Sequence, residues 1–413
     1  MSVSIEELIA RADAVVSGFG YAPSTLSQYR WAWSQVKLIC FQEPDVTELT
    51  DEIVASFLQF VAAEHREGRI REWKRKLLRK AVLVLSEVAR TGTYTWSVSR
   101  AVHPNDGLDA MLRPVQEQFE QWLAGRDLAV ATADLYATVS RKVLAWLPER
   151  GVTDVRRLCA SDVSAAVVFL GESYRPGSTR TVLTALRVLC RFLEESDQCV
   201  GLARAVPVAF TRRIRAVSVL SAEDVETLVV SPIPATPTGR RDRAILLVGA
   251  RTGLRPGDIV GLRLRDIDWR YGQITVTQHK TGTALSLPLL ADVGAAIADY
   301  LLHDRPHSDD DHVFLRSQAP HVALSSSDLY HVSESALART NLAPRADMGR
   351  GMRVLRASLA TRMLEADTPL AVISGALGHR GIDSAKHYLA TDEKRMRQCC
   401  LDFTGIEPRA VRS

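Results

Sequence analysis

The chain has 413 residues, a length that predicts about three domains, each large enough to bury its own core. Its composition, 46% hydrophobic and 24% charged, is ordinary for a globular protein, and no apolar run is long enough for a membrane span. The first segment lacks a basic stretch and carries Glu6 and Glu7 within an apolar pattern, so we expect no secretory signal and a cytoplasmic location. Six scattered cysteines without a C-x-x-C pair argue against zinc sites and disulfide frameworks.

The N-terminal half is predicted to be helical throughout, because apolar residues recur at spacings of three and four. Its pattern is repeated at an offset of about 105 to 109 residues. The matching segments are residues 24–39 and 131–147, then 49–61 and 160–172, then 74–91 and 179–195. We interpret them as two similar helical bundles in tandem. The alternative is that two unrelated amphipathic bundles resemble each other in pattern alone.

Basic residues gather on the last helix of each predicted bundle and in the segment that follows the second bundle. They are Lys74, Arg75, Lys76, Arg79 and Lys80, then Arg180 and Arg187, then Arg212, Arg213 and Arg215. Their occurrence at equivalent places in both bundles favours a polyanion-binding surface, although solvated helix faces carry similar charge runs. We expect Trp31, Trp33 and Trp73 to fill cores rather than to stack on a ligand.

The remainder of the chain, beyond a basic linker that contains Pro207, is predicted to mix helix and strand. Ser221 and Asp224 form an acidic variant of a capping box before an apolar helix. The segments "QITVTQ" and "ALSLPL" have strand character and flank "HKTGT", which predicts a hairpin with Lys280 at its tip. The fold class is therefore mainly α with a small β-hairpin or sheet in the last domain.

These patterns divide the chain into five predicted segments. They are an N-terminal helical domain over 1–103, a second helical domain over 112–202, a basic linker over 203–219, an α+β domain over 220–402 and a tail over 403–413.

The α+β domain holds a set of polar residues that could carry chemistry. "TGLRPGDIVGLRLRDID" places Arg255 at a tight turn, with Asp258 either bracing that guanidinium or acting as a first-turn acid of the next helix. The segment "RVLRASLATRMLEADTPLAVISGALGHRGIDSAKHYL" adds the other polar groups, which are Arg353, Arg356, His379 and Tyr388.

In order and spacing these residues resemble the tyrosine recombinase (phage integrase) family over the whole of residues 221–402. "TGLRPGDIVGLRLRDID" is close to the family's first arginine box, and "LGHRGIDSAKHYL" is close to its histidine–tyrosine box. The resemblance implies an integrase-type catalytic domain preceded by a core-binding domain, with the upstream copy as an arm-type or second DNA-binding domain. It departs from the family at Arg353, where the H-x-x-R box usually begins with histidine.

The resemblance implies a site-specific recombinase that cuts and rejoins DNA through a 3′-phosphotyrosyl intermediate on Tyr388. Two arginines, Arg255 and Arg356, would clamp the phosphate with forked bonds, and Arg353 would add a further phosphate contact. Lys280 would be the general acid and His379 a hydrogen-bond partner of the phosphate. No metal or other cofactor is expected. The departure at Arg353 leaves the acceptor of the phenol proton unassigned.

The implied partners are double-stranded DNA target sites, with a dimer on each site and a homotetramer on two sites. An accessory DNA-bending protein and association with a bacterial nucleoid belong to the same expectation, and so does a role in a mobile element. The segment "EKRMRQCCLDF" could dock on a neighbouring protomer or pack on its own domain. Two alternatives remain: a type IB topoisomerase or telomere-resolvase-like enzyme, and a non-catalytic DNA-binding protein on the same scaffold.

Overall fold

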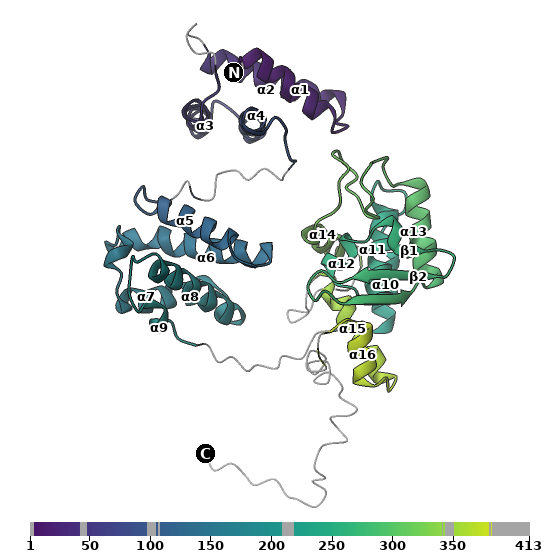
Figure 1. The fold of residues 1–413 in the computed structure, drawn as a ribbon. Coiled ribbons are helices and arrows are strands. Elements are labelled where there is room, and N and C mark those ends of the chain that lie inside the picture. Colours follow the sequence, from purple (N-terminus) through teal and green to yellow (C-terminus); the bar gives the residue numbers. More distant parts are fainter. Residues whose placement is uncertain are drawn as a thin grey trace, which may run out of the picture. The chain divides into compact units, whose positions relative to one another are not determined.

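The structure is a computed structural model that describes residues 4–41, 48–96, 105, 108–208, 219–340, 342, 351–379 and 381. The chain divides into two compact units, Val98–Arg213 and a second unit made of Met1–Ser97 with Ile214–Ser413. The described residues are mainly helical with one small antiparallel sheet, so the predicted fold class is confirmed (Figure 1). None of the helices in these ranges has the length and apolar character of a membrane span.

The first bundle consists of α1 (Ile5–Ser17), α2 (Pro23–Cys40), α3 (Asp51–Arg66) and α4 (Glu72–Thr91). Trp33 is fully buried at its centre, where the indole Nε1 donates to the carbonyl of Ala81 at 3.1 Å. The expectation that all three tryptophans fill cores is wrong for two of them, since Trp31 is 38% and Trp73 59% exposed. Residues two apart on a helix point about 200° apart, so Trp31 cannot share the inward face of Trp33.

The second bundle has the same order of four helices. They are α5 (Arg113–Ala124), α6 (Val130–Trp146), α7 (Ala160–Ser173) and α8 (Thr179–Glu195), followed by the short α9 (Leu202–Ala205). The first helix of each bundle packs on the second and the fourth, and the second packs on the fourth. This shared arrangement supports the interpretation of a duplicated bundle.

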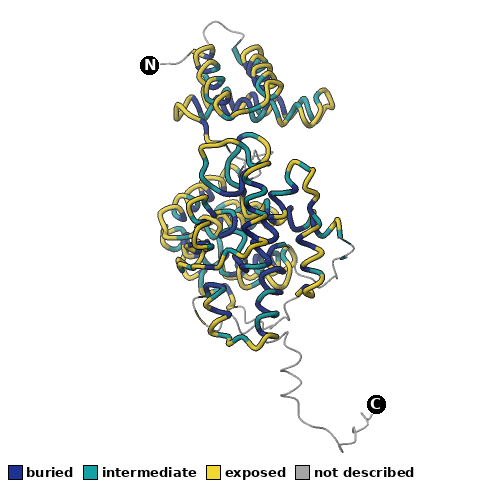
Figure 2. Tube along the Cα trace, turned by 90° about the vertical axis from the view of Figure 1, so that its right-hand side faces the viewer, coloured by how far each residue is buried: buried dark blue, intermediate teal, exposed yellow. Residues whose placement is uncertain are grey.

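Each bundle has an apolar cluster of its own, and the last domain has one large cluster and a smaller one within residues 357–377. Buried and exposed residues alternate along the helices of the first bundle (Figure 2). Leu202 and Val206 belong to the core of the second bundle, so this bundle continues into the first residues of the predicted linker. The rest of that linker, from residue 209 to residue 218, lies outside the described residues.

The last domain is built around one buried helix. Its helices are α10 (Ala222–Val230), α11 (Gly239–Thr252), α12 (Pro256–Val260), α13 (Ala291–His303), α14 (Ser326–Arg339), α15 (Arg353–Glu365) and α16 (Leu370–Ala376). The five helices α10, α12, α13, α14 and α15 all pack against α11. The predicted capping box is present at the start of α10, where the Asp224 amide donates to Ser221 Oγ at 3.0 Å.

The predicted hairpin is present as β2 (Gln273–Thr277) and β3 (Ala284–Pro288), and β1 (Ile267–Asp268) pairs with the other edge of β2. Ile274 pairs with Leu287 and Val276 with Leu285, in an antiparallel register. Alternate residues of β2 are buried, so one face of the sheet packs on the core while the other is exposed. This register fixes where the turn between β2 and β3 projects.

Candidate active site

One backbone carbonyl, that of Leu377, joins two distant segments of the last domain. Arg356 Nη2 donates to it at 2.9 Å from α15, and Gln278 Nε2 donates to it at 3.0 Å from the end of β2. Leu377 is the C-terminal cap of α16, where carbonyl groups lack helical partners and carry partial negative charge. A guanidinium and an amide therefore both find a favourable acceptor there.

Arg356 is buried, at 8% exposure, and its guanidinium bridges three backbone and side-chain groups. Nη1 donates to the carbonyl of Gly253 at 2.7 Å, and Nη2 lies 2.8 Å from His379 Nε2. A guanidinium can only donate, so Nε2 of His379 accepts and the neutral ring carries its proton on Nδ1. Arg356 and His379, each predicted as a site residue, are thus in direct contact.

Arg255 is connected to the same carbonyl through the side chain of Gln278. It is the N-terminal cap of α12, and its Nη1 donates to Gln278 Oε1 at 2.5 Å. Gly253, which precedes it by two residues, has the left-handed φ of 64° that ends α11. That turn brings the Gly253 carbonyl to Arg356 and directs Arg255 toward Gln278. The two predicted clamp arginines are therefore linked through the side-chain amide of Gln278 and the Leu377 carbonyl.

Asp258 is 4% exposed, and its carboxylate contacts the hairpin as well as Arg255. Its Oδ1 accepts from the backbone amide of His279 at 3.0 Å, whereas its Oδ2 is 4.0 Å from Arg255 Nη1. The sequence suggested that Asp258 either braces Arg255 or acts as a first-turn acid of the helix, and neither role includes this hydrogen bond to the hairpin. That bond ties the base of the Lys280 turn to α12, the helix that Arg255 caps.

The structure leaves two of the predicted catalytic cations exposed. Lys280 lies in the turn between β2 and β3, two residues beyond Gln278. Arg353 is the first residue of α15, and its side chain forms no hydrogen bond or ion pair with another described residue. Tyr388 and the linker residues Arg212, Arg213 and Arg215 lie outside the described residues.

The basic residues of α4 differ in how far their charge is available. Arg75 grips Glu72 through two bonds of 2.6 and 2.7 Å, and these bonds lower the pKa of Glu72 to about 2. Lys76 also contacts Glu72, at 3.5 Å, and burial lowers the pKa of Lys80. Arg79 is half-buried on the same helix. Lys74 lies over the exposed ring of Trp31, 5.0 Å from its centroid.

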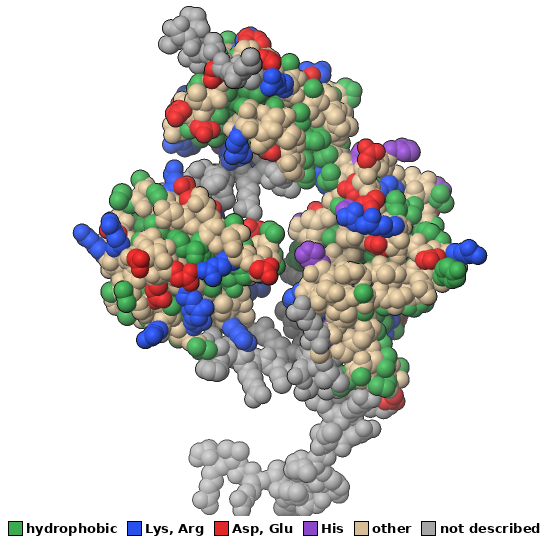
Figure 3. Space-filling model, viewed as in Figure 1, with side chains coloured by type: hydrophobic (Ala, Val, Ile, Leu, Met, Phe, Trp, Pro, Cys, Tyr) green, Lys and Arg blue, Asp and Glu red, His purple; other side chains and the backbone are tan. Residues whose placement is uncertain are grey.

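The two basic residues predicted on α8 have different environments. Arg180 is exposed at the start of the helix, on a bundle whose surface carries several Lys and Arg side chains (Figure 3). Arg187 instead donates to the carbonyls of Val206 and Pro207, both at 3.0 Å. Arg187 therefore holds the end of the second bundle in place.

Gln278 is a site residue that the sequence prediction missed, and it packs against the turn at Gly378. Gly378 has a φ of 62°, and a Cβ there would lie 2.4 Å from Gln278 Oε1. The signal for Gln278 is its position: it follows the buried Ile274 and Val276 at the same spacing, where an apolar residue is expected.

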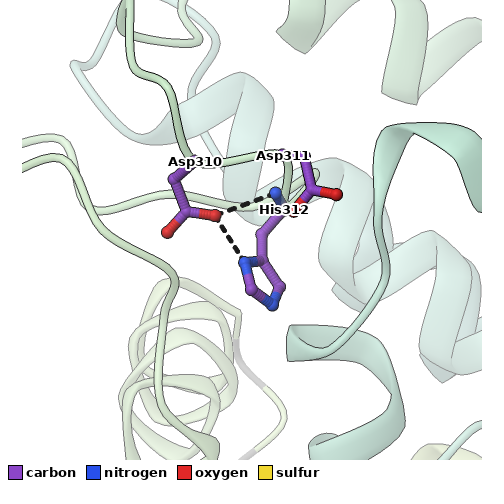
Figure 4. Close-up of side chains that lie close together, drawn as sticks. All are labelled: Asp310, Asp311 and His312. Atoms are coloured by element: carbon purple, nitrogen blue, oxygen red, sulfur yellow. Dashed lines mark hydrogen bonds and ion pairs between the residues drawn. The ribbon is translucent and has the colours of Figure 1, made fainter.

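Asp310, Asp311 and His312 form a second polar cluster, on the loop before residue 313 (Figure 4). Asp310 Oδ1 accepts from the His312 ring at 2.5 Å, and its Oδ2 accepts from the amide of Ala323 at 3.0 Å. Asp311 pairs with Arg263 at 2.5 Å. These bonds fix the loop against its neighbours, which gives the cluster a structural role.

Comparison with known proteins matches residues 218–395 to the phage integrase family. A putative integrase/recombinase of Sinorhizobium fredii, y4gC, is 38% identical over 194 residues, which are 47% of this chain and 99% of the relative. A second one from that organism, y4rF, is 32% identical over 64% of this chain, and the alignment spans 63% of the relative. The fold is similar to that of a lambda integrase tetramer bound to a Holliday junction. That structure has a TM-score of 0.52 and 16% identity, over 82% of this chain and 90% of the other.

The fold and the matches together define the class of protein, a site-specific DNA recombinase of the tyrosine type. The chain belongs to the phage integrase family.

The contact between Gly378 and Gln278 makes a testable prediction about this turn. Gly378→Ala should destabilise the domain by about 1–3 kcal/mol, because alanine is strained at positive φ and its Cβ meets Gln278. Gly375→Ala, three residues earlier on α16, meets nothing within 4 Å and should stabilise by up to about 1 kcal/mol. Thermal unfolding of the two variants would measure both effects, and equal melting temperatures would contradict the geometry.

Proposed function

We propose that this protein cuts and rejoins DNA by attack of the Tyr388 phenol on a phosphodiester. The phenol oxygen bonds to phosphorus and gives up its proton, and the bond from phosphorus to the 5′ oxygen breaks. The product is a 3′-phosphotyrosyl link, which a 5′-hydroxyl of another strand reverses to complete the exchange. Because the link conserves the energy of the phosphodiester, rejoining draws on no outside energy source.

The observation that carries the proposal is the meeting of Arg255, Arg356 and His379 around the Leu377 carbonyl. Attack at phosphorus builds negative charge on the non-bridging oxygens, and two guanidinium groups from separate helices can bind those oxygens with charge-assisted bonds. The same positive charge favours the phenolate of a tyrosine whose ordinary pKa is near 10.

The position of Arg353 supports a further phosphate contact. A cation in the first turn of a helix faces the positive end of the helix dipole, which is unfavourable unless an anion binds nearby. A guanidinium stays protonated at neutral pH, so Arg353 would bind a phosphate oxygen and would not accept the phenol proton.

Covalent attachment tests the proposal directly. A nicked duplex that carries the target site lets the cut strand diffuse away, so the covalent product should accumulate and be visible on a denaturing gel. Tyr388→Phe should remove this product without loss of DNA binding, and Arg356→Gln should slow its formation by roughly 10²–10³-fold. Arg265→Gln, an exposed arginine outside the cluster, is the matched control. A wild-type protein that binds the site and forms no covalent product would contradict the proposal.

The role of Lys280 as general acid has its own test. Lys280→Ala should slow cleavage of an ordinary duplex by roughly 10²-fold or more, because the 5′ oxygen leaves poorly without a proton. A substrate with sulfur at the bridging 5′ position has a better leaving group, so the variant should cleave it at nearly the wild-type rate. A variant that stays slow on the sulfur substrate would assign Lys280 a different role.

DNA is the proposed partner of both bundles as well as of the catalytic domain. The solved lambda integrase is a tetramer bound to a Holliday junction. By analogy we propose a dimer on each site and a tetramer on two sites. Of the predicted contacts on the two bundles, Arg180 is exposed and Lys74 is half-buried over the ring of Trp31. Arg75 and Lys76 pair with Glu72, Arg79 and Lys80 are half-buried, and Arg187 is bonded to backbone carbonyls. The linker arginines Arg212, Arg213 and Arg215 remain proposed contacts.

The salt dependence of DNA affinity distinguishes residues that contact phosphates from residues that do not. Each phosphate contact that is removed should lower the slope of log affinity against log salt by about 0.9, so Lys74→Ala and Arg180→Ala should each show that change. Arg187→Ala should leave the slope unchanged and destabilise the second bundle, since Arg187 holds the Val206 and Pro207 carbonyls. Arg11→Ala, a surface arginine paired with Glu7, is the control. Unchanged slopes for Lys74→Ala and Arg180→Ala would remove both residues from the interface.

A further inference from the structure

Gln278 is a buried polar residue at the centre of the site, with an exposed fraction of 0%. Its side chain makes three hydrogen bonds. Oε1 accepts from Arg255 Nη1 at 2.5 Å and from Thr281 Oγ1 at 2.9 Å, and Nε2 donates to the Leu377 carbonyl at 3.0 Å. A buried amide with both ends bonded has a defined orientation, because only one placement of its oxygen and nitrogen satisfies these partners.

The three bonds connect three parts of the site. Arg255 caps the N-terminus of α12, Thr281 lies in the turn that carries Lys280, and Leu377 precedes the turn that carries His379. The fit is close, because a Cβ on Gly378 would meet Gln278 Oε1 at 2.4 Å. A shift of the amide would therefore move the first arginine, the hairpin and the histidine turn together.

Glutamine is the side chain that matches these partners in both polarity and charge. Leucine or methionine has the volume but neither donates nor accepts, and asparagine is one methylene shorter. A glutamate would accept from Arg255, but as a carboxylate it cannot donate to the Leu377 carbonyl. It would also place a negative charge on Arg255, and that charge would compete with a phosphate for the guanidinium.

We propose that Gln278 is a positioning residue: its neutral amide holds Arg255 in line with Arg356 and His379 while leaving the positive charge of Arg255 available to the scissile phosphate. The inference rests on the proposed function for the identity of that phosphate. The linkage of Arg255, the hairpin and the histidine turn through Gln278 can be tested without any reaction.

The test compares Gln278→Leu and Gln278→Glu with Gln273→Leu and Gln273→Glu in the full-length protein. Gln273 is an exposed glutamine at the other end of β2, outside the site. The rate of covalent product formation on the nicked duplex is measured at saturating protein, and affinity is measured separately on an intact site. Both Gln278 variants should cleave roughly 10²-fold more slowly with nearly unchanged DNA affinity, because a misplaced clamp acts on the chemical step. The Gln273 variants should match the wild type.

A pH profile distinguishes positioning from simple packing. A protonated glutamic acid carries no charge, and it can donate its O–H to the Leu377 carbonyl while its carbonyl oxygen accepts from Arg255. Cleavage by Gln278→Glu should therefore recover toward the wild-type rate as pH falls, relative to Gln278→Leu, which should show no such recovery. A Gln278→Glu profile parallel to that of Gln278→Leu would overturn the matched-polarity argument.

Hydrogen exchange gives a readout that needs no DNA. In Gln278→Leu the backbone amides of residues 279–282 and 377–379 should exchange faster together, while Gln273→Leu should change neither group. If the wild type forms no covalent product, the proposed function fails and this measurement still decides the linkage. If Gln278→Leu folds, cleaves at the control rate and exchanges as the control does, the positioning role is excluded. If Gln278→Leu does not fold, the pH profile of Gln278→Glu against Gln273→Glu decides instead.

Discussion

The geometry of the candidate site depends on the hydrogen bonds that converge on the Leu377 carbonyl. Arg356 and Gln278 both donate to it, and through these two side chains the carbonyl is connected to Gly253, His379 and Arg255. The oxygen can serve two donors because it ends a helix and has no helical partner of its own. Cationic groups that would repel one another in isolation are thus held close by neutral acceptors, in a domain whose central helix, α11, fixes the surrounding elements.

This arrangement suits a reaction whose charge develops only as bonds change. A clamp that is already oriented costs little reorganisation when the phosphate becomes more negative, and this is the main way in which fixed donors accelerate such steps. The hairpin turn is held by the same group of residues, because the Asp258 carboxylate accepts from the His279 amide and Thr281 donates to Gln278. Lys280 therefore lies on a turn that is anchored at its base, while its own side chain is exposed.

The sequence was sufficient to predict the helices and the hairpin, and it supplied the charged residues that are candidates for the site. Arg255, Arg356 and His379 lie in local patterns with distinctive neighbours, and the period-two pattern of β2 and β3 predicted the hairpin. The contacts of these side chains with backbone atoms could not be predicted from the sequence. The partner of Gln278 is a carbonyl 99 residues away, and a carbonyl has no side-chain signature. For the same reason nothing in the sequence indicated that Arg187, predicted as a DNA contact, bonds to two carbonyls of its own bundle.

The most direct test of the central claim is a structure of the Tyr388→Phe protein bound to an uncleaved target duplex. The account predicts one phosphodiester whose non-bridging oxygens are bound by Arg255 and Arg356, with His379 in hydrogen-bond distance and Gln278 still bonded to the Leu377 carbonyl. A scissile phosphate bound away from these two guanidinium groups, or a complex in which Arg255 and Arg356 contact different phosphates, would contradict it.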